Sequence, residues 1–338
     1  ISYADAFQII HNHLDAAMEA ANITGSSGTL NKQARSAARS AFEGAKQRFF
    51  GHLLTSMKTP TLIRSIERDL KEGHSSVIQI VSTGEALMER RLAEIPTEEW
   101  SDVRVDITPR EYVLDYLAHS FPVQLYEPFT DGDGNVSSRA VFRDGQPVES
   151  REAVARRDAL IEKLASLPPV PGALDQIIQR FGADTVAEVT GRSRRIVCKP
   201  TADGRGKRFV VENRAGSANL AEAQAFMDDQ KRALIFSDAG GTGRSYHADL
   251  AARNQRRRKH YLLESGWRAD TAIQGLGRTN RTNQAQPPLF SPITTDVKAE
   301  KRFQSTIARR LDSMGAITRG QRQTGGQGLF RPEDNLES

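Results

Sequence analysis

The sequence contains little of what several common classes of protein require. One of its 338 residues is a cysteine, Cys198, which excludes an intrachain disulfide and a multi-cysteine metal site and is typical of a reducing compartment. No apolar run approaches the roughly 20 residues that a membrane-spanning helix needs. The N-terminus also lacks the charged start and apolar core of a signal peptide. We therefore expect no membrane partner and a cytoplasmic location.

Motifs that would let one domain hydrolyse ATP are also missing. A search for G-x-x-x-x-G-K-[ST] finds none, because GRGKR (204–208) lacks the first glycine and the Ser/Thr. No D-E-x-H box for Mg²⁺ is present. DGDGNV (131–136) begins like a calcium-binding loop, but Val136 stands where that loop needs glycine and Phe142 where it needs glutamate. The chain alone is therefore predicted to be inactive as an ATPase and to hold no metal.

Both ends of the chain resemble cuts in a longer polypeptide. The sequence begins at Ile1 rather than at a methionine, and it stops in the polar run RPEDNLES. We therefore expect further domains outside it.

Positive charge is concentrated in one segment. The formal net charge is +5, an excess that permits a polyanionic partner without requiring one. Residues 251–283 hold eight cations against Glu264 and Asp270, so this segment carries +6 and the rest of the chain sums to −1. Such a cluster is either a solvated basic face or a binding surface.

Strands that alternate with helices predict the fold class. Three apolar runs are typical of buried parallel strands: 76–82 (SVIQIVS), 232–237 (RALIFS) and 260–264 (HYLLE). Two more strands are predicted at 195–198 and 208–212. Helices are predicted at 3–22, 32–55, 61–71, 83–91, 108–119, 151–166, 173–181, 183–189, 219–229, 270–279 and 297–313. We therefore predict an α/β fold, a RecA-like lobe with a central parallel β-sheet flanked by helices.

Two local signals set helix boundaries in this prediction. Pro60 suits the first turn of a helix, and Asn219 with Glu222 forms a capping box.

His11 and His13 are two apart on a predicted helix, so they face different sides and make a poor metal pair.

The pattern divides the chain into four parts. Residues 1–75 form a helical segment that leads into the lobe, and residues 76–101 and 170–315 form the lobe itself. Residues 102–169 depart from the α/β alternation, carry a hairpin turn at DGDGN and are predicted to be an inserted subdomain. The tail, residues 316–338, is expected to be flexible.

The helix predicted at 270–279 carries the most specific arrangement of charge. On a helix, Gln274, Arg278 and Arg281 lie at i, i+4 and i+7 and project from one side. Gly277 is expected to leave room for another backbone. Two aligned guanidinium groups can reach a triphosphate with planar, permanently charged forks. In phosphoryl transfer such an arginine contributes roughly 10³–10⁵ in rate.

A glycine-rich turn precedes this helix in the sequence. LIFSDAGGTGRS (234–245) is a strand that runs into a turn with Thr242 and Ser245. Backbone N–H groups in such a turn can hold a phosphate or a nucleic-acid backbone. Turns without a function look the same, so the turn alone does not decide between them.

The order of these motifs resembles motifs V and VI of superfamily-two helicases, and it is similar in particular to the strawberry notch family of helicase-like proteins. A strand, the AGGTG turn, a second strand, Gly-Trp and Q-x-x-G-R-x-x-R-x-x-Q follow one another up to residue 284. The similar stretches are QRFF (47–50), STGEA (82–86), VAEVTGR (186–192), FSDAGGTGRSYHAD (236–249), NQRRRKHYLLESGWRADTAIQGLGRTNRTNQ (254–284) and EKRFQSTIARRLDSMGAITRGQR (300–322). They cover most of 45–92 and 170–322, whereas 102–165 matches poorly.

This resemblance implies nucleotide-site roles. Arg278 and Arg281 would be the motif VI arginines that contact the ATP γ-phosphate, with Arg281 as the arginine finger, and Gln274 would set their geometry or contact nucleotide. The motif V turn would link nucleotide state to the bound strand, through Gly241, Thr242 and Gly243. Asp249 would touch the ribose, unless it pairs with the Arg256–Arg258 run.

It also implies nucleic-acid contacts, each with a structural alternative. Ser82 and Thr83 would contact a backbone phosphate, or they cap a helix. Arg256, Arg257 and Arg258 would line a nucleic-acid track, or they flank the sheet. Independently of the resemblance, Trp267 would either stack on a base or pack in the core at the end of a strand.

We therefore predict the C-terminal, second RecA-like lobe of an ATP-dependent helicase or translocase that acts on nucleic acid, preferentially DNA. ATP and Mg²⁺ would be bound mainly by an N-terminal RecA-like lobe of the same polypeptide. The resemblance also suggests a methyltransferase domain as a neighbour and a bacterial, phage or plasmid origin, with a nuclear location if the source is eukaryotic.

Two other functions fit the sequence. One is a non-catalytic nucleic-acid-binding or transcription-regulating module, which an intact P-loop upstream would argue against. The other is a protein-interaction scaffold, which a steep salt dependence of DNA binding would argue against.

Overall fold

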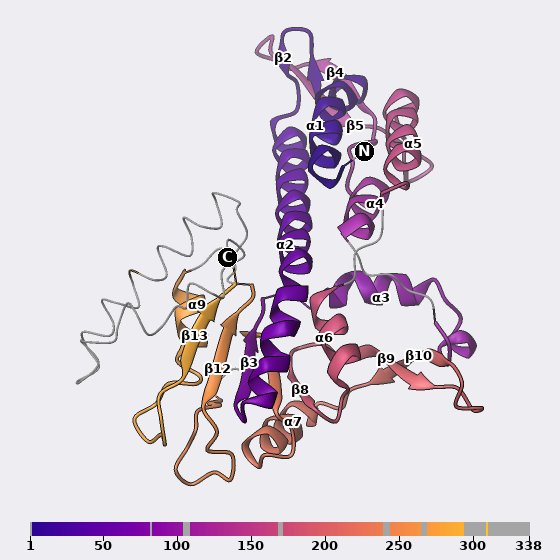
Figure 1. The fold of residues 1–338 in the computed structure, drawn as a ribbon. Coiled ribbons are helices and arrows are strands. Elements are labelled where there is room, and N and C mark those ends of the chain that lie inside the picture. The colour runs from indigo at the N-terminus through magenta and orange to yellow at the C-terminus, as the bar shows by residue number, and fades with distance from the viewer. Residues whose placement is uncertain are drawn as a thin grey trace. The chain divides into compact units, whose positions relative to one another are not determined.

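The computed structural model describes residues 2–81, 83–103, 109–167, 172–238, 244–264, 269–293 and 309. The chain folds into two compact units (Figure 1). Unit 1 comprises Ile1–Leu53 and Asp106–Val170, and unit 2 comprises Leu54–Val105 and Pro171–Ser338. Most of the segment predicted as an insertion thus shares a unit with the N-terminal helices.

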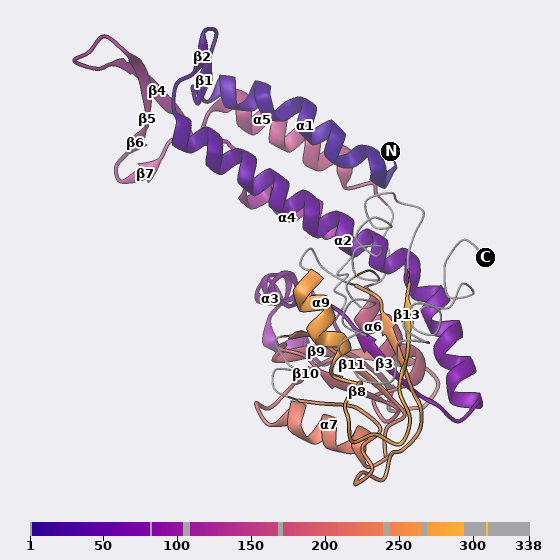
Figure 2. The same cartoon turned by 90° about the vertical axis from the view of Figure 1, so that its left-hand side faces the viewer.

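Unit 1 combines helices with short hairpins. Its helices are α1 (Tyr3–Ala20), the first part of α2 (Lys32–Lys71), α4 (Pro109–His119) and α5 (Arg151–Leu164). Its hairpins pair β1 (Thr24–Gly25) with β2 (Gly28–Thr29), β4 (Tyr126–Thr130) with β5 (Val136–Ala140), and β6 (Phe142–Arg143) with β7 (Gln146–Pro147). α1 and α5 lie side by side (Figure 2). The hairpin turn predicted at DGDGN is confirmed between β4 and β5.

An aromatic cluster forms the centre of the unit 1 core. The ring of Phe7 lies 5.8 Å from that of Phe42 and 4.8 Å from that of Phe49, and Tyr116 packs edge-on to Phe42 at 6.1 Å. All four side chains are buried. These contacts join α1, α2 and α4, so the segment after residue 106 completes the core of the N-terminal helices.

One continuous helix replaces the two that the sequence predicts around Pro60. Pro60 lies inside α2, so the predicted helix start at this residue is wrong. An interior proline removes one helix hydrogen bond and crowds the preceding turn, at a cost of about 3 kcal/mol. Leu62 and Ile66 follow it, and both are fully buried against the sheet of unit 2. Their burial offsets the cost and keeps the helix continuous.

Unit 2 is built on a five-stranded parallel sheet with the order β13-β12-β3-β11-β8. Its strands are β3 (Ser75–Gln79), β8 (Val186–Val189), β11 (Ala233–Phe236), β12 (Arg258–Leu262) and β13 (Leu289–Pro292). Every residue of the first four is buried, as strands covered on both faces require. The predicted fold class, an α/β lobe of RecA-like type with a central parallel sheet flanked by helices, is confirmed.

Helices cover both faces of this sheet. The described helices of unit 2 are the end of α2, α3 (Glu85–Ala93), the 3-10 helix η1 (Thr97–Glu99), α6 (Ala173–Phe181), α7 (Ala218–Met227) and α9 (Ala269–Leu276). On one face, Ile78 and Ile235 pack with α2 and α6. On the other face, Phe236 packs with Phe226 of α7. Successive residues of each strand alternate between the two faces.

Two secondary-structure predictions in unit 2 need correction. Residues 183–189, predicted as a helix, contain strand β8, because Val186, Ala187 and Val189 extend the buried sheet beyond β11. The predicted capping box of α7 is absent, since the side chain of Asn219 donates to the backbone oxygen of Thr190 (2.7 Å) instead. Tertiary contacts override the local signal in both cases.

The strands predicted near residues 195 and 208 exist but do not join the central sheet. They form a separate antiparallel hairpin of β9 (Arg194–Pro200) and β10 (Lys207–Asn213). The helix predicted at 297–313 lies outside the described residues, apart from residue 309.

Candidate functional site

Part of the predicted site lies at one edge of the parallel sheet. Its five strands all point the same way, so their carboxyl ends share that edge. Ligands of open α/β sheets bind outside the carboxyl ends of the strands. Residues 83–84 follow β3, residues 190–193 follow β8 and residues 237–238 follow β11. The candidate site is formed by these segments and by the residues that pack on them.

Arg278 and Arg281 converge on residues 244–245, which follow the glycine-rich turn. The Nη1 atom of Arg278 donates to the backbone oxygen of Arg244 (2.7 Å), and the Nε atom of Arg281 donates to Oγ of Ser245 (3.1 Å). The backbone N–H of Tyr246 donates in turn to the backbone oxygen of Arg278 (2.6 Å). Both predicted arginines are therefore fastened to one short segment.

The two arginines do not project from a helix as the sequence predicts. α9 ends at Leu276, and the backbone N–H of Arg278 donates to the oxygen of Gly275 (3.0 Å) in a tighter turn. Gln274 does lie on α9, where it is exposed. Within the described residues no hydrogen bond joins its side chain to either arginine. The arginines meet through the segment they both bind and not through a shared helix face.

Charge and burial place Arg278 beside the end of β11. Burial raises the pKa of Asp238, and the positive charge of Arg278 opposes that rise. Burial also raises the pKa of Tyr246 to about 12, against the charges of Arg278 and Arg244. Arg278 is half-buried among these groups, whereas Arg281 is exposed. Arg281 is thus the arginine whose guanidinium is open to a ligand.

Asp249 links two parts of this site. Its carboxylate lies 3.4 Å from Nε2 of His247 and accepts from the side-chain amide of Asn283 (3.1 Å). Asp249 also forms an isolated antiparallel bridge with Gln284. Among the described residues, Asp249 forms no ion pair with the Arg256–Arg258 run, the alternative that the sequence left open. Its contact with a ribose stays a prediction.

The basic run Arg256–Arg258, predicted as a nucleic-acid track, is largely engaged inside the protein. Arg258 begins the buried strand β12 and is 1% exposed, so it is not available to a backbone phosphate. Its guanidinium donates to the oxygens of Tyr246 (2.8 Å), His247 (3.0 Å), Arg256 (2.6 Å) and Asn254 (3.0 Å). Arg256 pairs with Asp229 (2.9 Å). Arg257 is half-buried, and its role stays a prediction.

Thr83 lies one residue before Gly84, the N-cap of α3, where no side chain makes a capping hydrogen bond. Its Oγ1 accepts from the backbone N–H of Glu85 (3.3 Å) at the start of α3. Gly84 between them has φ 72°, a left-handed conformation that favours glycine. The remaining predicted site residues, Ser82, Gly241, Thr242 and Gly243, lie outside the described residues, as does Trp267.

A buried chain of polar side chains, here called the His260 chain (Gln79, His260 and Thr279), connects the sheet to the turn that carries the arginines. His260 on β12 bonds through Nδ1 to Oγ1 of Thr279 (2.7 Å) and through Nε2 to Oε1 of Gln79 (3.0 Å). The amide nitrogen of Gln79 donates to the backbone oxygen of Ala272 in α9 (3.1 Å). The Gln79 oxygen must therefore accept, which assigns the proton of His260 to Nε2.

The His260 chain holds the turn between the two arginines. Thr279 lies between Arg278 and Arg281 in sequence, so its bond to the sheet restrains both. α9 approaches Gln79 so closely that a Cβ at Gly275 would overlap the Gln79 amide. At Gly277, where the sequence analysis expects the close approach, only carbonyl oxygens of the preceding turn come near.

We expect Gly275→Ala to destabilise unit 2 by about 1–3 kcal/mol, because the new methyl group must displace the buried Gln79 amide. Gly51→Ala is the matched control, since it lies in α2 and a Cβ there meets nothing within 4 Å. It should be neutral or stabilising by up to about 1 kcal/mol. Urea unfolding midpoints measure both changes. Equal destabilisation by the two would contradict the close packing at Gly275.

The His260 chain is expected to make stability depend on pH. Burial lowers the pKa of His260 to about 3, from 6.5 in an unfolded chain. Between these values the unfolded state binds the extra proton, so this contribution is complete above pH 6.5 and is lost as the pH falls toward 3. From pH 7 to 5 the loss from this one residue is about 2 kcal/mol.

His260→Gln offers an amide to Gln79 and an oxygen to Thr279 without titrating in this range. Urea unfolding at pH 7 and pH 5 should show that the variant loses about 2 kcal/mol less than the wild type. His52 in unit 1 remains in both proteins with a pKa lowered by burial to about 4, so some acid dependence persists. An unchanged difference between the two pH values would rule out a neutral, buried His260.

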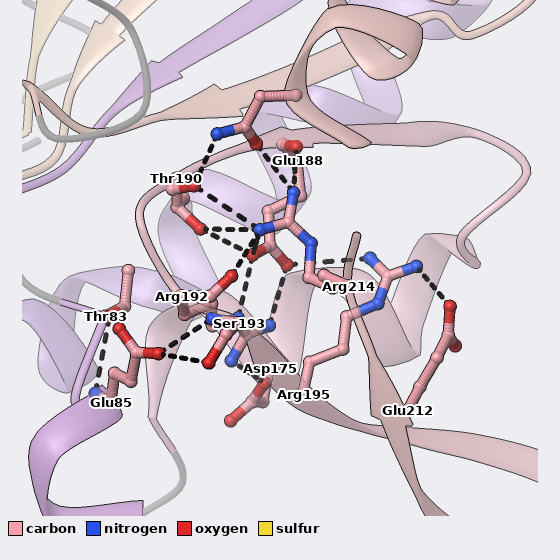
Figure 3. A network of polar contacts seen from close by, with 11 residues as sticks. Thr83, Glu85, Asp175, Glu188, Thr190, Arg192, Ser193, Arg195, Glu212 and Arg214 are labelled. Atoms are coloured by element: carbon pink, nitrogen blue, oxygen red, sulfur yellow. Dashed lines mark hydrogen bonds and ion pairs between the residues drawn. The ribbon is translucent and has the colours of Figure 1, made fainter. Parts of the chain in front are cut away.

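A second network is centred on Glu188 of β8, which is fully buried (Figure 3). Arg192 donates to both its carboxylate oxygens through Nε and Nη2 (2.8 Å each), and Thr190 donates through Oγ1 (2.6 Å). Arg214 and Arg195 lie 3.4 and 3.5 Å from the carboxylate. Burial alone would raise the pKa of Glu188, but Arg192 and Arg214 outweigh it and lower the pKa to about 2.

This Glu188 network fixes the loop after β8 and joins it to α3. Arg214 donates to the backbone oxygens of Glu188 and Arg192 (2.7 Å each). Ser193 donates through its backbone N–H (2.7 Å) and its hydroxyl (3.0 Å) to Glu85, whose own N–H binds Thr83 (Figure 3). The segments that follow β8 and β3 are therefore tied together at the carboxyl edge.

Gln79, His260, Glu188 and Arg214 were not predicted from the sequence as site residues. Gln79 and Glu188 each stand in an apolar run, and that is a usable signal, because a buried polar group persists only where it has partners. Arg214 gives no local signal, since the two carbonyls it binds lie 26 and 22 residues away.

In the part of the chain that the structure describes, no group of three or more His, Cys, Asp or Glu side chains could hold a metal ion. Asp131 in the DGDGN turn accepts from the backbone N–H groups of Asp133 and Asn135 (2.9 Å each). No helix among the described residues has the length and apolarity to cross a membrane.

Known proteins resemble this chain in sequence. Residues 172–338 match a helicase C-terminal family model, the C-terminal domain on Strawberry notch homologue. The chain is 30% identical to protein strawberry notch homolog 1 of Rattus norvegicus over 350 residues, which cover 83% of this chain and 27% of that protein. It is 39% identical to protein FORGETTER 1 of Arabidopsis thaliana over 191 residues, 55% of this chain and 15% of that protein.

A third relative, protein strawberry notch homolog 2 of Homo sapiens, is 29% identical over 405 residues, 96% of this chain and 29% of that protein. The chain thus spans less than a third of the length of each of these relatives. They are animal and plant proteins, so they do not support the expected bacterial, phage or plasmid origin. No solved structure gives a significant match.

Proposed function

Since residues 172–338 belong to the helicase C-terminal family of strawberry notch proteins, we propose that this chain supplies one half of an ATPase site in a nucleic-acid-dependent helicase or translocase. The observation that carries the proposal is the convergence of Arg278 and Arg281 on residues 244–245, directly after the glycine-rich turn. A phosphate-sensing arginine would then be fastened to the segment that directly follows the predicted phosphate-binding turn.

The two arginines would divide the work. Arg281 is exposed and is held at Nε by Ser245, so its terminal nitrogens can face the γ-phosphate of ATP as a fork. It would neutralise the charge that develops on the transferring phosphoryl group. Arg278 is half-buried and donates to the backbone oxygen of Arg244, which suits a residue that keeps residues 244–245 in place beside the nucleotide.

The buried networks would keep this arrangement rigid. The His260 chain holds the turn between the arginines, and the Glu188 network holds the segment next to Thr83. Electrostatic catalysis requires charges fixed before the reaction begins. Both networks join the site to the central sheet, so a movement of the lobe as a whole would move the arginines with it.

ATP and Mg²⁺ would be held mainly by a second, N-terminal RecA-like lobe of the parent protein. The P-loop lysine and the magnesium carboxylates belong to that lobe in this proposal, because this sequence contains neither motif. Arg278 and Arg281 fit the remaining role in this site, which is to place guanidinium groups against the phosphates. The nucleic acid in the proposal is DNA.

The test is ATP hydrolysis by the full-length parent, with and without DNA, for the wild type and for Arg281→Ala. We expect hydrolysis that DNA stimulates and that depends on Arg281. Arg253→Ala is the control, an exposed arginine of unit 2 outside the site. A parent that binds DNA but hydrolyses no ATP would replace the proposal with a non-catalytic nucleic-acid-binding or transcription-regulating module.

A further inference from the structure

The turn of the β9–β10 hairpin concentrates positive charge that nothing in the described chain neutralises. Four exposed cations surround it: Lys199, Arg205, Lys207 and Arg208. In the residues that the structure describes, none of these four side chains forms an ion pair or a hydrogen bond. The turn lies at the rim of unit 2 (Figure 1). We call these four residues the hairpin cations.

Two of the hairpin cations face each other across the strands. The register of β9 and β10 pairs Arg208 directly with Lys199. Like charges directly opposite each other in an antiparallel pair destabilise it. Phe209 follows Arg208 and is 37% exposed, and by strand alternation it lies on the other face of the hairpin, which it shares with Lys207. An anion placed between the opposed cations would relieve their repulsion.

The turn itself is ordered by its own hydrogen bonds. Asp203, the acidic residue of the turn, accepts from the hydroxyl of Thr201 (2.5 Å) and from the backbone N–H of Arg205 (3.0 Å). The hydrogen bond from Thr201 and then that from Arg205 lower the pKa of Asp203. Gly206 donates its N–H to the Thr201 hydroxyl (3.0 Å). The carboxylate of Asp203 thus stabilises the turn and pairs with none of the hairpin cations.

The base of the hairpin is fastened to unit 2. The backbone N–H of Val103 donates to the oxygen of Phe209 (2.8 Å), and that of Val211 donates to the oxygen of Trp100 (3.1 Å). The guanidinium of Arg194 lies 5.0 Å from the centre of the Trp100 ring. A hairpin with an anchored base and an ordered turn presents its cations at little further entropic cost.

We propose that the hairpin cations bind the phosphate backbone of a nucleic acid, at a site separate from the helicase motifs. Unpaired Lys and Arg side chains around a narrow turn suit a chain of phosphates, and an exposed phenylalanine offers a surface on which a base can stack. The run at Arg256–Arg258 is engaged internally, so the hairpin is the better placed cationic surface. The inference rests on the proposed function only in that the chain acts on nucleic acid.

The test measures binding of the whole chain to a labelled oligothymidine by fluorescence anisotropy over a series of salt concentrations. The hairpin variant is K199Q/R205Q/K207Q/R208Q. The control is K32Q/K46Q/R48Q/K163Q, which removes four exposed cations from unit 1. We expect the hairpin variant to bind at least tenfold more weakly at low salt and the control to stay within about twofold of the wild type.

The salt dependence sharpens the result. Each lost phosphate contact should reduce the slope of log Kd against log salt by about 0.7, so loss of three or four contacts reduces it by roughly 2–3. The melting temperature of the hairpin variant should be unchanged or slightly raised, because the opposed charges are gone. A variant that melts earlier and binds weakly would be judged through K199Q alone, which must still weaken binding without lowering the melting temperature.

Three outcomes overturn the inference. If the hairpin variant binds as tightly as the control, nucleic acid contacts another surface and the proposed function stands. If the wild type binds no nucleic acid, the proposed function itself fails. If poly-L-glutamate of equal charge displaces oligothymidine as well as unlabelled oligothymidine does, the surface fits an acidic protein and not a nucleic acid.

Discussion

Replacing Glu188 with glutamine is expected to lower the free energy of unfolding of unit 2 by about 3–5 kcal/mol. The change keeps the volume of the side chain and removes its charge. It leaves Arg192, which is 1% exposed, with one acidic partner, Asp175 (2.9 Å), in place of two. Arg214 and Arg195 are also buried and lose the same neighbour. A buried cation without its anion keeps its desolvation penalty, because water cannot reach it to solvate the charge.

Urea unfolding at pH 7 measures the effect of Glu188→Gln. The matched control is Glu212→Gln, which also removes a carboxylate from Arg195 but at a partly exposed position, and it should cost less than about 1 kcal/mol. The double variant Glu188→Met with Arg192→Met should be more stable than Glu188→Gln, because it removes both charges together. A loss below about 1 kcal/mol for Glu188→Gln would show that the carboxylate is not the centre of the network.

Glu188 is also expected to make the stability of unit 2 depend on pH. Glu188 has a pKa of about 2 in the folded protein, against 4.5 in an unfolded chain. Its contribution is therefore complete above pH 4.5 and is lost as the pH falls toward 2. The His260 range, pH 6.5 to 3, begins above the Glu188 range, pH 4.5 to 2, so the loss of stability above pH 4.5 reports His260 without Glu188.

Strands β3, β11 and β12 of the central sheet could be predicted from the sequence because they are short apolar runs, which signal burial without any knowledge of their neighbours. The edge strand β13 was not predicted. Residues 183–189 show where this signal fails. Their apolar positions fit a helix as well as a strand, and the place beside β11 decides between them. The helix start predicted at Pro60 is wrong for the opposite reason. Here the local signal is strong, but the burial of the residues that follow Pro60 keeps α2 continuous.

The candidate site could likewise be predicted only in part from the sequence. Arg278 and Arg281 could be selected from their spacing, but the reason given, a shared helix face, is wrong because α9 ends before them. What joins them is a set of contacts to residues 244–245, more than 30 residues earlier in the chain. The nucleic-acid contact predicted for Arg258 is wrong for a related reason, since a run of basic residues does not reveal that one of them begins a buried strand.

Arg281→Ala in the full-length parent is expected to lower the rate of ATP hydrolysis by about 10³-fold or more, because an arginine finger contributes roughly 10³–10⁵ in rate. The loss should fall on kcat more than on KM, since the guanidinium acts mainly on charge that develops in the transition state. Arg253→Ala should hydrolyse ATP as the wild type does. DNA affinity should be unchanged in both variants, which separates this site from the hairpin cations.

The chemistry of the side chain gives a second comparison. Arg281→Lys keeps the charge but loses the planar fork and the Nε–H group that Ser245 binds. It should therefore recover only a small part of the lost rate. Recovery close to the wild-type rate would mean that a point charge is enough, and that the geometry at Ser245 does not matter for hydrolysis. Steady-state ATPase assays at saturating DNA distinguish these results.

Ser245→Ala tests the positioning of Arg281 without touching the guanidinium. It removes the oxygen that accepts from Nε at 3.1 Å, a bond to a charged group worth about 1.5–3 kcal/mol when it is shielded from water. Arg281 is exposed, so the lower part of that range applies and the expected loss is about tenfold in kcat. The order wild type, Ser245→Ala, Arg281→Ala follows only if Arg281 does the chemistry and Ser245 aims it. Equal losses for the two variants would instead assign the effect to a collapse of the turn that carries both.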